Sequence, residues 1–345
     1  MHMANELLSV PVAAGTLAVA AAGLGFICRK LREVITSEKL ALMGVLGAFV
    51  FAAQMVNFQL PAMPGTSGHM IGAVLLAIML GPHAAALVIS SVVIIQCLIF
   101  QDGGLLALGC NIINMAIVPS YLGYFIYRSV AAKATSGIRV YLAALLACVL
   151  AIEAGAVLVP VQAALSNVLV VPFTTFLATM LGVHFLVGVC EGLITVAVLG
   201  YVRQMRPDLM VNQFRGQIRL SRKAVLATFL VLTVAVGAVL SLFASSFPDG
   251  LEWSYAERPD KPDFRPYVAN EDDTISAVDD FQSKYSLLPD YSVRSSRIGR
   301  MAAEDVEPAA GWTSFAAVAG SALTMGFVWL TAQLLRKKRV AQNLT

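Results

Sequence analysis

Charged residues are scarce in this sequence. Asp, Glu, Lys and Arg make up 13% of its 345 residues, whereas 58% are hydrophobic. An ordinary soluble domain is about a quarter charged, and the mean hydropathy here is +0.76. The composition therefore excludes a soluble globular protein and predicts a membrane protein with several spans. We expect membrane lipid, and no nucleic acid, among its partners.

Paired cysteines and nucleotide-binding loops are also missing. The five cysteines lie inside or at the ends of apolar runs and form no C-x-x-C pair, so we expect small core residues and neither disulfides nor a zinc site. No G-x-x-x-x-G-K-[ST] segment occurs, so the chain has no P-loop to hold ATP phosphates. The sequence predicts no enzyme and no cofactor, and any ATP hydrolysis is expected on a separate subunit.

Nine apolar segments reach or approach the ~20 residues that cross a bilayer. They are residues 9–28, 39–57, 68–81, 84–100, 105–127, 138–160, 175–201, 223–244 and 312–334. Segment 68–81 is short for a full span, but the Gly81-Pro82-His83 turn after it predicts a helical hairpin. The expected fold is all-α and polytopic, with a seven-helix core followed by a C-terminal two-helix hairpin.

Basic residues indicate the orientation. Seventeen of the 24 Lys and Arg lie outside residues 245–311, and nine spans with an external N-terminus place all of them on the cytoplasmic side. The C-terminus is then cytoplasmic, in a chain of the cytoplasmic (inner) membrane. Residues 245–311 lie outside and hold fourteen of the 21 Asp and Glu. This acidic loop is expected either to attract cations weakly or to be solvated and without a role.

A change of composition near residue 205 divides the chain. We expect a core over residues 1–202 and a basic cytoplasmic linker over 203–223. The hairpin, with its acidic external loop, then occupies 224–345. This arrangement suggests a fusion of two polypeptides.

The first two residues carry a metal-binding donor set. No basic residue precedes Arg29, so the opening is not a secretory signal. If the terminus stays as encoded, Met1 and His2 supply an α-amine, a backbone amide and an imidazole, which can close two fused chelate rings. A planar array of nitrogens suits Ni(II) or Cu(II), with Co(II) a weaker candidate. The alternative is a frayed terminus that binds nothing.

His69 is the candidate for the fourth donor. It ends an external loop rich in Pro and Gly, and such irregular backbone is tolerated at membrane depth only inside protein or beside a polar cavity. A lone histidine is either a satisfied core residue or a ligand. Further polar candidates would orient the donors or merely join helices. They are Ser67, Gln101, Asn111, Asn114, His184 and Glu191.

Four motifs, in this order, resemble the CbiM/NikM substrate-binding components of energy-coupling factor transporters for cobalt and nickel. They are the Met1-His2-Met3-Ala4 opening, the Gly65-Thr66-Ser67-Gly68-His69 loop, Phe100-Gln101-Asp102-Gly103-Gly104-Leu105, and the segment from His184 to Thr195. Pro248-Asp249-Gly250-Leu251-Glu252 resembles the small CbiN/NikN partner subunit, here fused to the core.

This resemblance implies a ligand set and partners. The ligands would be the Met1 amine, the His2 amide and imidazole, and the His69 imidazole. Uptake would be driven by a transmembrane T subunit (CbiQ/NikQ-like) and an ATPase subunit (CbiO/NikO-like). The opening is closer to the nickel branch, and cobalt for cobalamin synthesis is the alternative. Every implied ligand precedes residue 203, so the hairpin is expected to assist without supplying one.

Two other classes of function compete with metal uptake. Gly65-Thr66-Ser67-Gly68 matches a short G-x-S-G pattern, which would make Ser67 the nucleophile and His184 the base of an intramembrane serine protease. A metal receptor that signals without transport would need a cytoplasmic output domain. The longest cytoplasmic segment, 202–223, is too short for one.

Overall fold

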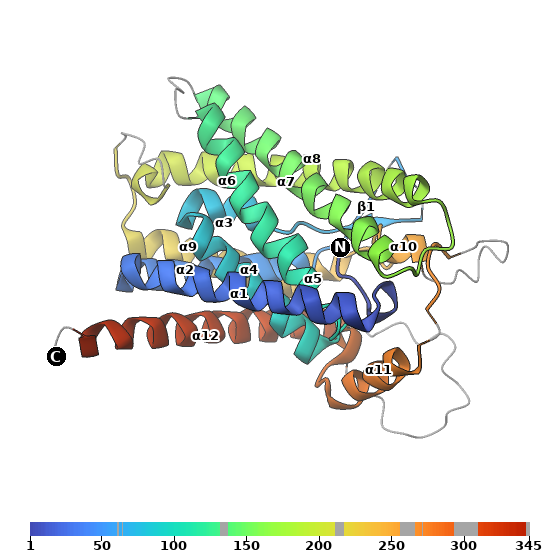
Figure 1. Ribbon diagram of the computed structural model, residues 1–345. Helices are drawn as coiled ribbons and strands as arrows, with labels where there is room; N and C mark the ends of the chain where they lie inside the picture. Colours follow the sequence, from blue (N-terminus) through green and yellow to red (C-terminus); the bar gives the residue numbers. More distant parts are fainter. Residues whose placement is uncertain are drawn as a thin grey trace.

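The computed structural model describes residues 1–60, 62–63, 65–131, 137–210, 217–255, 266–270, 272–292 and 310–342. The predicted basic linker and acidic loop therefore lie partly outside the described residues. Figure 1 shows long helices running side by side, with the N-terminus inside the molecule.

Eight of the described helices are long and apolar enough to cross a membrane. They are α1 (Val10–Val34), α2 (Ser37–Gln54), α4 (Pro82–Phe100), the run Leu108–Ala131, α7 (Gly137–Leu165), α8 (Phe173–Met205), the run Arg222–Phe243 and α12 (Ala310–Gln342). Two of these runs are composite. The first joins α5 (Leu108–Asn111), the π-helix η2 (Ile112–Ile117) and α6 (Val118–Ala131), and the second joins α9 (Arg222–Ala238) and η4 (Leu240–Phe243). The prediction of an all-α, polytopic membrane fold is confirmed.

Burial separates central from peripheral helices. The apolar windows of α2 and α4 are 72% and 78% buried, whereas that of α1 is only 17% buried. Large apolar side chains such as Leu17 and Phe26 on α1 are exposed. Since lipid is as apolar as these side chains, α1 suits the lipid-facing edge of the bundle and α4 its centre.

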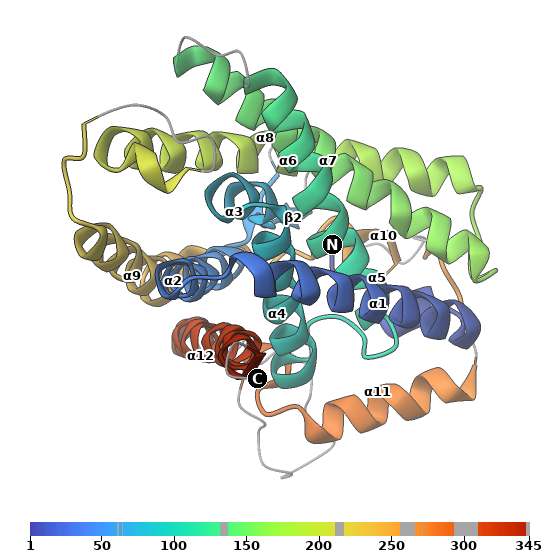
Figure 2. The ribbon, with the colours of Figure 1, turned by 60° about the vertical axis from the view of Figure 1, so that its left-hand side comes forward.

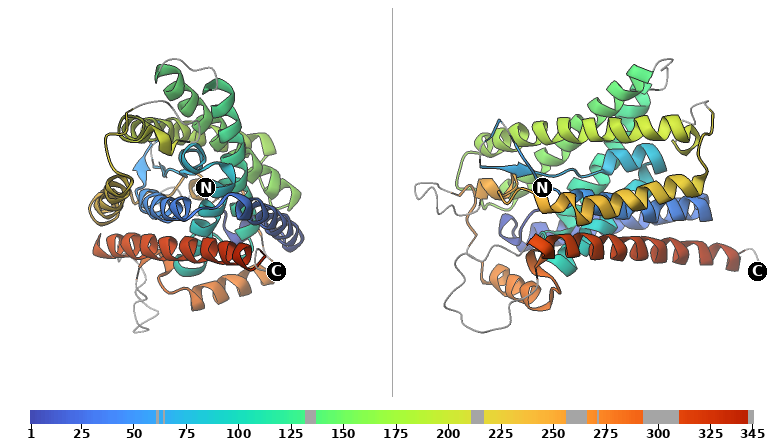
Figure 3. Two further views of the ribbon diagram at one scale, coloured as in Figure 1. Left: turned by 90° about the vertical axis from the view of Figure 1, so that its left-hand side faces the viewer. Right: turned by 180° about the vertical axis from the view of Figure 1, so that it is seen from behind.

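The segment 68–81 differs from its prediction. Its only helix is α3 (Ala73–Leu80), eight residues long and buried throughout. Extended chain precedes α3, and the right-hand view of Figure 3 shows this chain running along the bundle to the short helix. An extended residue advances about 3.3 Å and a helical residue 1.5 Å, so a stretch of this length crosses much of the bundle without a full-length helix.

One glycine allows this extended chain to turn into α3. Gly72 has φ of 79°, in the left-handed region. A Cβ there would lie 2.7 Å from Val50 Cγ1 on α2. After α3, Gly81 leads directly into α4. The ring of His83, at the start of α4, lies 6.1 Å from the ring of Phe26, so this end of α4 is near the basic end of α1.

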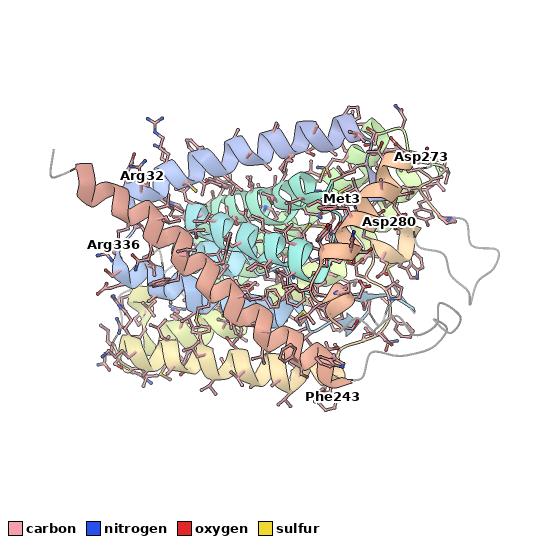
Figure 4. The ribbon with its side chains drawn as sticks, turned by 90° about the horizontal axis from the view of Figure 1, so that it is seen from below. Met3, Arg32, Phe243, Asp273, Asp280 and Arg336 are labelled. Carbon is pink, nitrogen blue, oxygen red and sulfur yellow. The ribbon has the colours of Figure 1, made fainter. Side chains whose placement is uncertain are left out.

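The C-terminal helices pack on the core. Helices α9 and α12 both contact α2 and each other, and Figure 2 shows the three side by side. Small residues permit the close approach: Gly47 of α2 faces Thr324 and Val328 of α12. Figure 4 shows Arg32 and Arg336 at one end of the molecule and Asp273 and Asp280 at the other. Basic and acidic ends are therefore opposite, as the orientation argument requires.

Short elements gather at the acidic end. They are η1 (Asn5–Leu7), β1 (Phe58–Gln59), β2 (Ser67–Gly68), α10 (Glu252–Tyr255), α11 (Asp273–Tyr285) and η5 (Pro289–Tyr291), whereas η3 (Pro207–Leu209) follows α8. Strands β1 and β2 pair antiparallel, and Ser67 also forms a parallel bridge with Asp249. The C-terminal unit therefore extends the small sheet that lies directly before His69.

Candidate metal centre

The first three residues fold back into the bundle. Met1, His2 and Met3 are 4%, 9% and 0% exposed. The Met3 N–H donates to Asn111 Oδ1 at 2.8 Å, and the Met3 carbonyl accepts from Asn111 Nδ2 at 3.1 Å and from the Gly104 N–H at 2.8 Å. The frayed terminus is therefore ruled out, and Asn111 holds the backbone of the opening segment.

Both ring nitrogens of His2 face an acceptor oxygen. Nδ1 lies 3.2 Å from Asp102 Oδ1, and Nε2 lies 3.1 Å from Gln96 Oε1. Burial lowers the pKa of His2 below 6.5, although Asp102 beside it favours the charged form. A neutral imidazole carries one N–H, so only one contact is a hydrogen bond. A cation bound at Nδ1 would lie beside the Asp102 carboxylate, which favours a positive charge there.

His69 lies against His2. The two rings stack with centroids 5.4 Å apart and planes at 23°. His69 Nδ1 is 3.1 Å from the Met70 carbonyl oxygen, an acceptor, so Nδ1 carries the hydrogen and Nε2 has a free lone pair. Burial, helped by the α-amine and by His2, lowers the pKa of His69 to about 4. Both imidazoles are thus in the form that binds metal.

Asp249 is a site residue that the sequence argument missed. Its Oδ2 accepts a hydrogen bond from the Met1 amine at 2.7 Å and lies 4.0 Å from His69 Nε2. Burial acts to raise the pKa of Asp249, but the adjacent α-amine and His69 outweigh burial and hold that pKa below its usual range. The residue is 248 positions from Met1, and its one sequence signal was the Pro248-Asp249-Gly250 turn.

A chain of amides joins the two imidazole segments. Gln96 Nε2 donates to Gln54 Oε1 at 2.8 Å, and Gln54 Nε2 donates to the Ile71 carbonyl at 2.7 Å. Glu191 accepts from the N–H groups of Ile71 and Gly72, the latter at 3.0 Å. The sequence indicated Glu191 and the polar position of Gln54, but not Gln96. Together these side chains fix the backbone that follows His69.

The remaining predicted residues take several positions. Asn114 forms a reciprocal amide pair with Gln162 at 2.8 and 2.9 Å, which joins two helices, and its Nδ2 also lies 3.5 Å from the Met3 sulfur in the opening segment. Gln101 ends α4 in a left-handed conformation, with φ of 58°, and lines a polar cavity together with His2 and His69. His184 lines a small cavity with Met1, His69 and Asp249. His184 therefore lies beside two of the proposed ligands, Met1 and His69.

The serine-protease alternative has no support in this geometry. The Ser67 hydroxyl donates to the Phe247 carbonyl at 2.6 Å, and His184 Nδ1 bonds the Met180 carbonyl at 2.8 Å. Each group is therefore engaged with backbone rather than with the other. Ser67 instead helps to hold the C-terminal unit on β2.

A polar cavity opens over the imidazoles. Its volume is about 740 Å³, and His2 and His69 lie on its wall. Five carboxylates also line it: Asp102, Asp249, Glu252, Asp279 and Asp290. Within the described part of the chain, no three His, Cys, Asp or Glu form a group that could hold a metal ion.

Replacing Glu191 tests whether it supports the site. Glu191→Ala leaves two buried N–H groups, of Ile71 and Gly72, without their acceptor, and each such orphan costs about 1–3 kcal/mol. We expect a lower thermal unfolding midpoint in detergent and weaker metal binding. Glu191→Gln keeps one acceptor oxygen and should lose less. An unchanged unfolding midpoint in Glu191→Ala would show that these contacts do not hold the segment.

The fold and the site define a class of protein: a polytopic membrane protein with a buried N-terminus and two stacked imidazoles on the wall of a polar cavity. The chain belongs to the CbiM family, described as the cobalt uptake substrate-specific transmembrane region, which matches residues 2–209. A PDGLE domain matches residues 223–337. The resemblance drawn from the motifs is therefore confirmed, and the chain is a fused transporter component of the CbiM/NikM and CbiN type.

Its relatives are metal transport proteins. The chain is 34% identical over 250 residues to a fused nickel transport protein, NikMN, from Archaeoglobus fulgidus, with 72% of this chain and 80% of that protein covered. It is 32% identical over 268 residues to the fused nickel transport protein LarMN of Lactiplantibacillus plantarum, with 74% and 79% covered. A crystal structure of a truncated transition metal transporter matches with a TM-score of 0.51 and 29% identity, and covers 59% of this chain and 98% of that chain.

Proposed function

We propose that this chain is the substrate-specific membrane component of an energy-coupling factor transporter that takes up nickel. One observation carries this proposal: the buried imidazoles of His2 and His69 stack on the wall of a polar cavity, and the buried Met1 lines a small second pocket together with His69. The amine, the His2 amide and His2 Nδ1 would close two fused chelate rings. His69 Nε2 would supply the fourth nitrogen.

Nickel fits this donor set better than cobalt does. The set has four nitrogens and includes a backbone amide, which must lose its proton, and Ni(II) binds such sites more tightly than Co(II) in the Irving–Williams order. The relatives named NikMN and LarMN are nickel transport proteins, whereas the CbiM family description names cobalt. Cobalt is the second candidate for that reason.

Direct binding tests this choice. Purified protein titrated with Ni(II) and with Co(II) should bind one equivalent of Ni(II) more tightly, with the absorption spectrum of a planar nickel complex. Tighter binding of Co(II), or an octahedral nickel spectrum, would contradict the proposed site.

Energy for uptake would come from partners. The sequence holds no P-loop, so we propose a CbiQ/NikQ-like T subunit and a CbiO/NikO-like ATPase in the cytoplasmic (inner) membrane. The N-terminus would then be external and the C-terminus cytoplasmic. Radioactive nickel uptake by cells that express the chain with and without these subunits tests the assignment, because the chain alone should bind the ion without accumulating it.

Acidification should release the ion. Protons compete with the metal for each nitrogen, so binding is lost as the pH falls. Burial lowers the pKa of His2 below 6.5 and, with the α-amine and His2, that of His69 to about 4. A lowered pKa keeps an imidazole unprotonated to lower pH, so the two rings should limit binding only below about pH 6.5.

A peptide control makes this prediction measurable. The imidazole of a free Met-His amide keeps its ordinary pKa. Calorimetric titration with Ni(II) at several pH values should show that the peptide loses its imidazole ligand at higher pH than the protein does. Equal pH midpoints for the imidazole step would contradict the effect of burial.

A further inference from the structure

The carboxylate of Asp249 is fixed in place by its own turn. Asp249 Oδ1 accepts from the N–H groups of Leu251 and Glu252 at 2.9 and 2.8 Å. The Ser67 N–H donates to the Pro248 carbonyl at 2.8 Å, which ties this turn to β2 beside His69. Three hydrogen bonds therefore aim the second oxygen, Oδ2, at the proposed metal ligands.

Asp249 Oδ2 lies between two of the four proposed nitrogen donors. The Met1 amine is 2.7 Å away and His69 Nε2 is 4.0 Å away. The side chain of Asp249 is 18% exposed and that of Met1 is 2% exposed. A charge at this position therefore acts through a largely buried space, where it is weakly screened.

Binding of the metal ion replaces one positive charge beside Asp249 by another. With the site empty, the charge beside Asp249 is the ammonium of Met1. A divalent ion bound by an amine, two imidazoles and one deprotonated amide also carries a net charge of +1. The carboxylate can thus balance the site in both states.

The two states respond differently if this carboxylate is removed. Asn111 holds the backbone at Met3, but Met1 precedes this anchor, so an ammonium that has lost its counter-charge can turn toward water. A bound ion cannot leave without ceasing to be bound, so it would remain as a buried, uncompensated charge, which is strongly unfavourable. Loss of the carboxylate should therefore weaken the loaded state more than the empty state.

We propose that Asp249, from the C-terminal unit, is the counter-ion and positioning residue of the N-terminal chelate. The inference rests on the proposed function. It gives the fused unit a direct part in ion binding: the core supplies the four nitrogens, and the PDGLE segment supplies the charge that balances the bound cation and holds the amine toward His69.

Substitution in the full-length protein tests this role, with Ni(II) alone as the probe. Asp249→Asn keeps an oxygen for the turn and removes the charge. We expect Kd for Ni(II) to rise about 10- to 100-fold, the range for partners that orient metal ligands. The absorption spectrum at saturating Ni(II) should stay that of the wild type, because all four nitrogens remain.

The matched control is Asp280→Asn. Asp280 is exposed on α11 in the same acidic external region, and Figure 4 shows it at the same end of the molecule as Met3. This variant loses the same charge without a contact to the site, so its Kd should equal that of the wild type. An equal loss in both variants would reduce the effect to general attraction by the acidic region, and would overturn the proposal.

Other outcomes also decide the question. An unchanged Kd in Asp249→Asn would overturn the counter-ion role alone, since the chelate would still bind. A shifted or absent spectrum at saturating Ni(II) would also overturn it, because Asp249 would then be a ligand or a purely structural residue. Failure of the wild type itself to bind one Ni(II) would instead reject the proposed function.

Discussion

An extension of several residues, none of them histidine, before Met1 should abolish nickel binding at this site and nickel uptake. The extension converts the α-amine into an amide and moves the free amine away, so the two fused chelate rings can no longer close on the same three atoms. It also removes the ammonium that Asp249 Oδ2 holds at 2.7 Å. Met1 is only 4% exposed, so the pocket offers no room for another residue. Calorimetry with Ni(II) and cellular nickel uptake measure the effect.

Two controls distinguish loss of the chelate from general damage to folding or membrane insertion. A tag of the same size after Thr345, a residue that lies outside the described part of the chain, should be tolerated. Retention of the N-formyl group changes no side chain and adds only one small group, yet it should be as harmful as the extension. If a correctly inserted, extended protein binds Ni(II) with unchanged affinity, the N-terminal chelate is wrong.

His69→Ala should have the second largest effect. The substitution removes the fourth nitrogen and the ring that stacks on His2 at 5.4 Å. Loss of a residue that only orients a metal ligand typically costs 10- to 100-fold in metal affinity. Loss of a ligand itself should therefore cost more than about 100-fold. Folding should survive, because Gln54 and Glu191 hold the backbone after His69 through contacts that the ring does not share.

The chain offers a matched control for this substitution. His83 lies near the basic end of α1, where its ring contacts Phe26 and Tyr121. His83→Ala removes one imidazole that does not line the polar cavity and should leave the Ni(II) affinity unchanged. Stoichiometric, tight binding by a folded His69→Ala protein would remove His69 from the ligand set.

The fold was largely readable from the sequence because apolar length is a local property. Each of the eight membrane-length helices matches an apolar run that could be counted residue by residue. Segment 68–81 was the exception. Its eight-residue helix depends on extended chain whose polar groups Gln54 and Glu191 satisfy from other helices, and those contacts carry no local signal.

The candidate site divides in the same way. Met1 and His2 could be proposed as ligands from the sequence because one dipeptide contains three nitrogens whose chelate geometry is set by covalent bonds. His69 was readable because an irregular, Pro- and Gly-rich loop at membrane depth must line protein or a cavity.

Asp249 and Gln96 could not be found in this way. Each acts through a contact that exists only after distant segments pack: Asp249 reaches Met1 across 248 positions, and Gln96 reaches His2 across 94. Hydrophobicity, turns and chelate rings are encoded over a few neighbouring residues, and the sequence states them directly. The pairing of Asp249 with the buried amine depends on tertiary packing. Helices α9 and α12 pack on α2 and so bring the Pro248-Asp249-Gly250 turn to β2. This pairing is therefore a property of the folded chain.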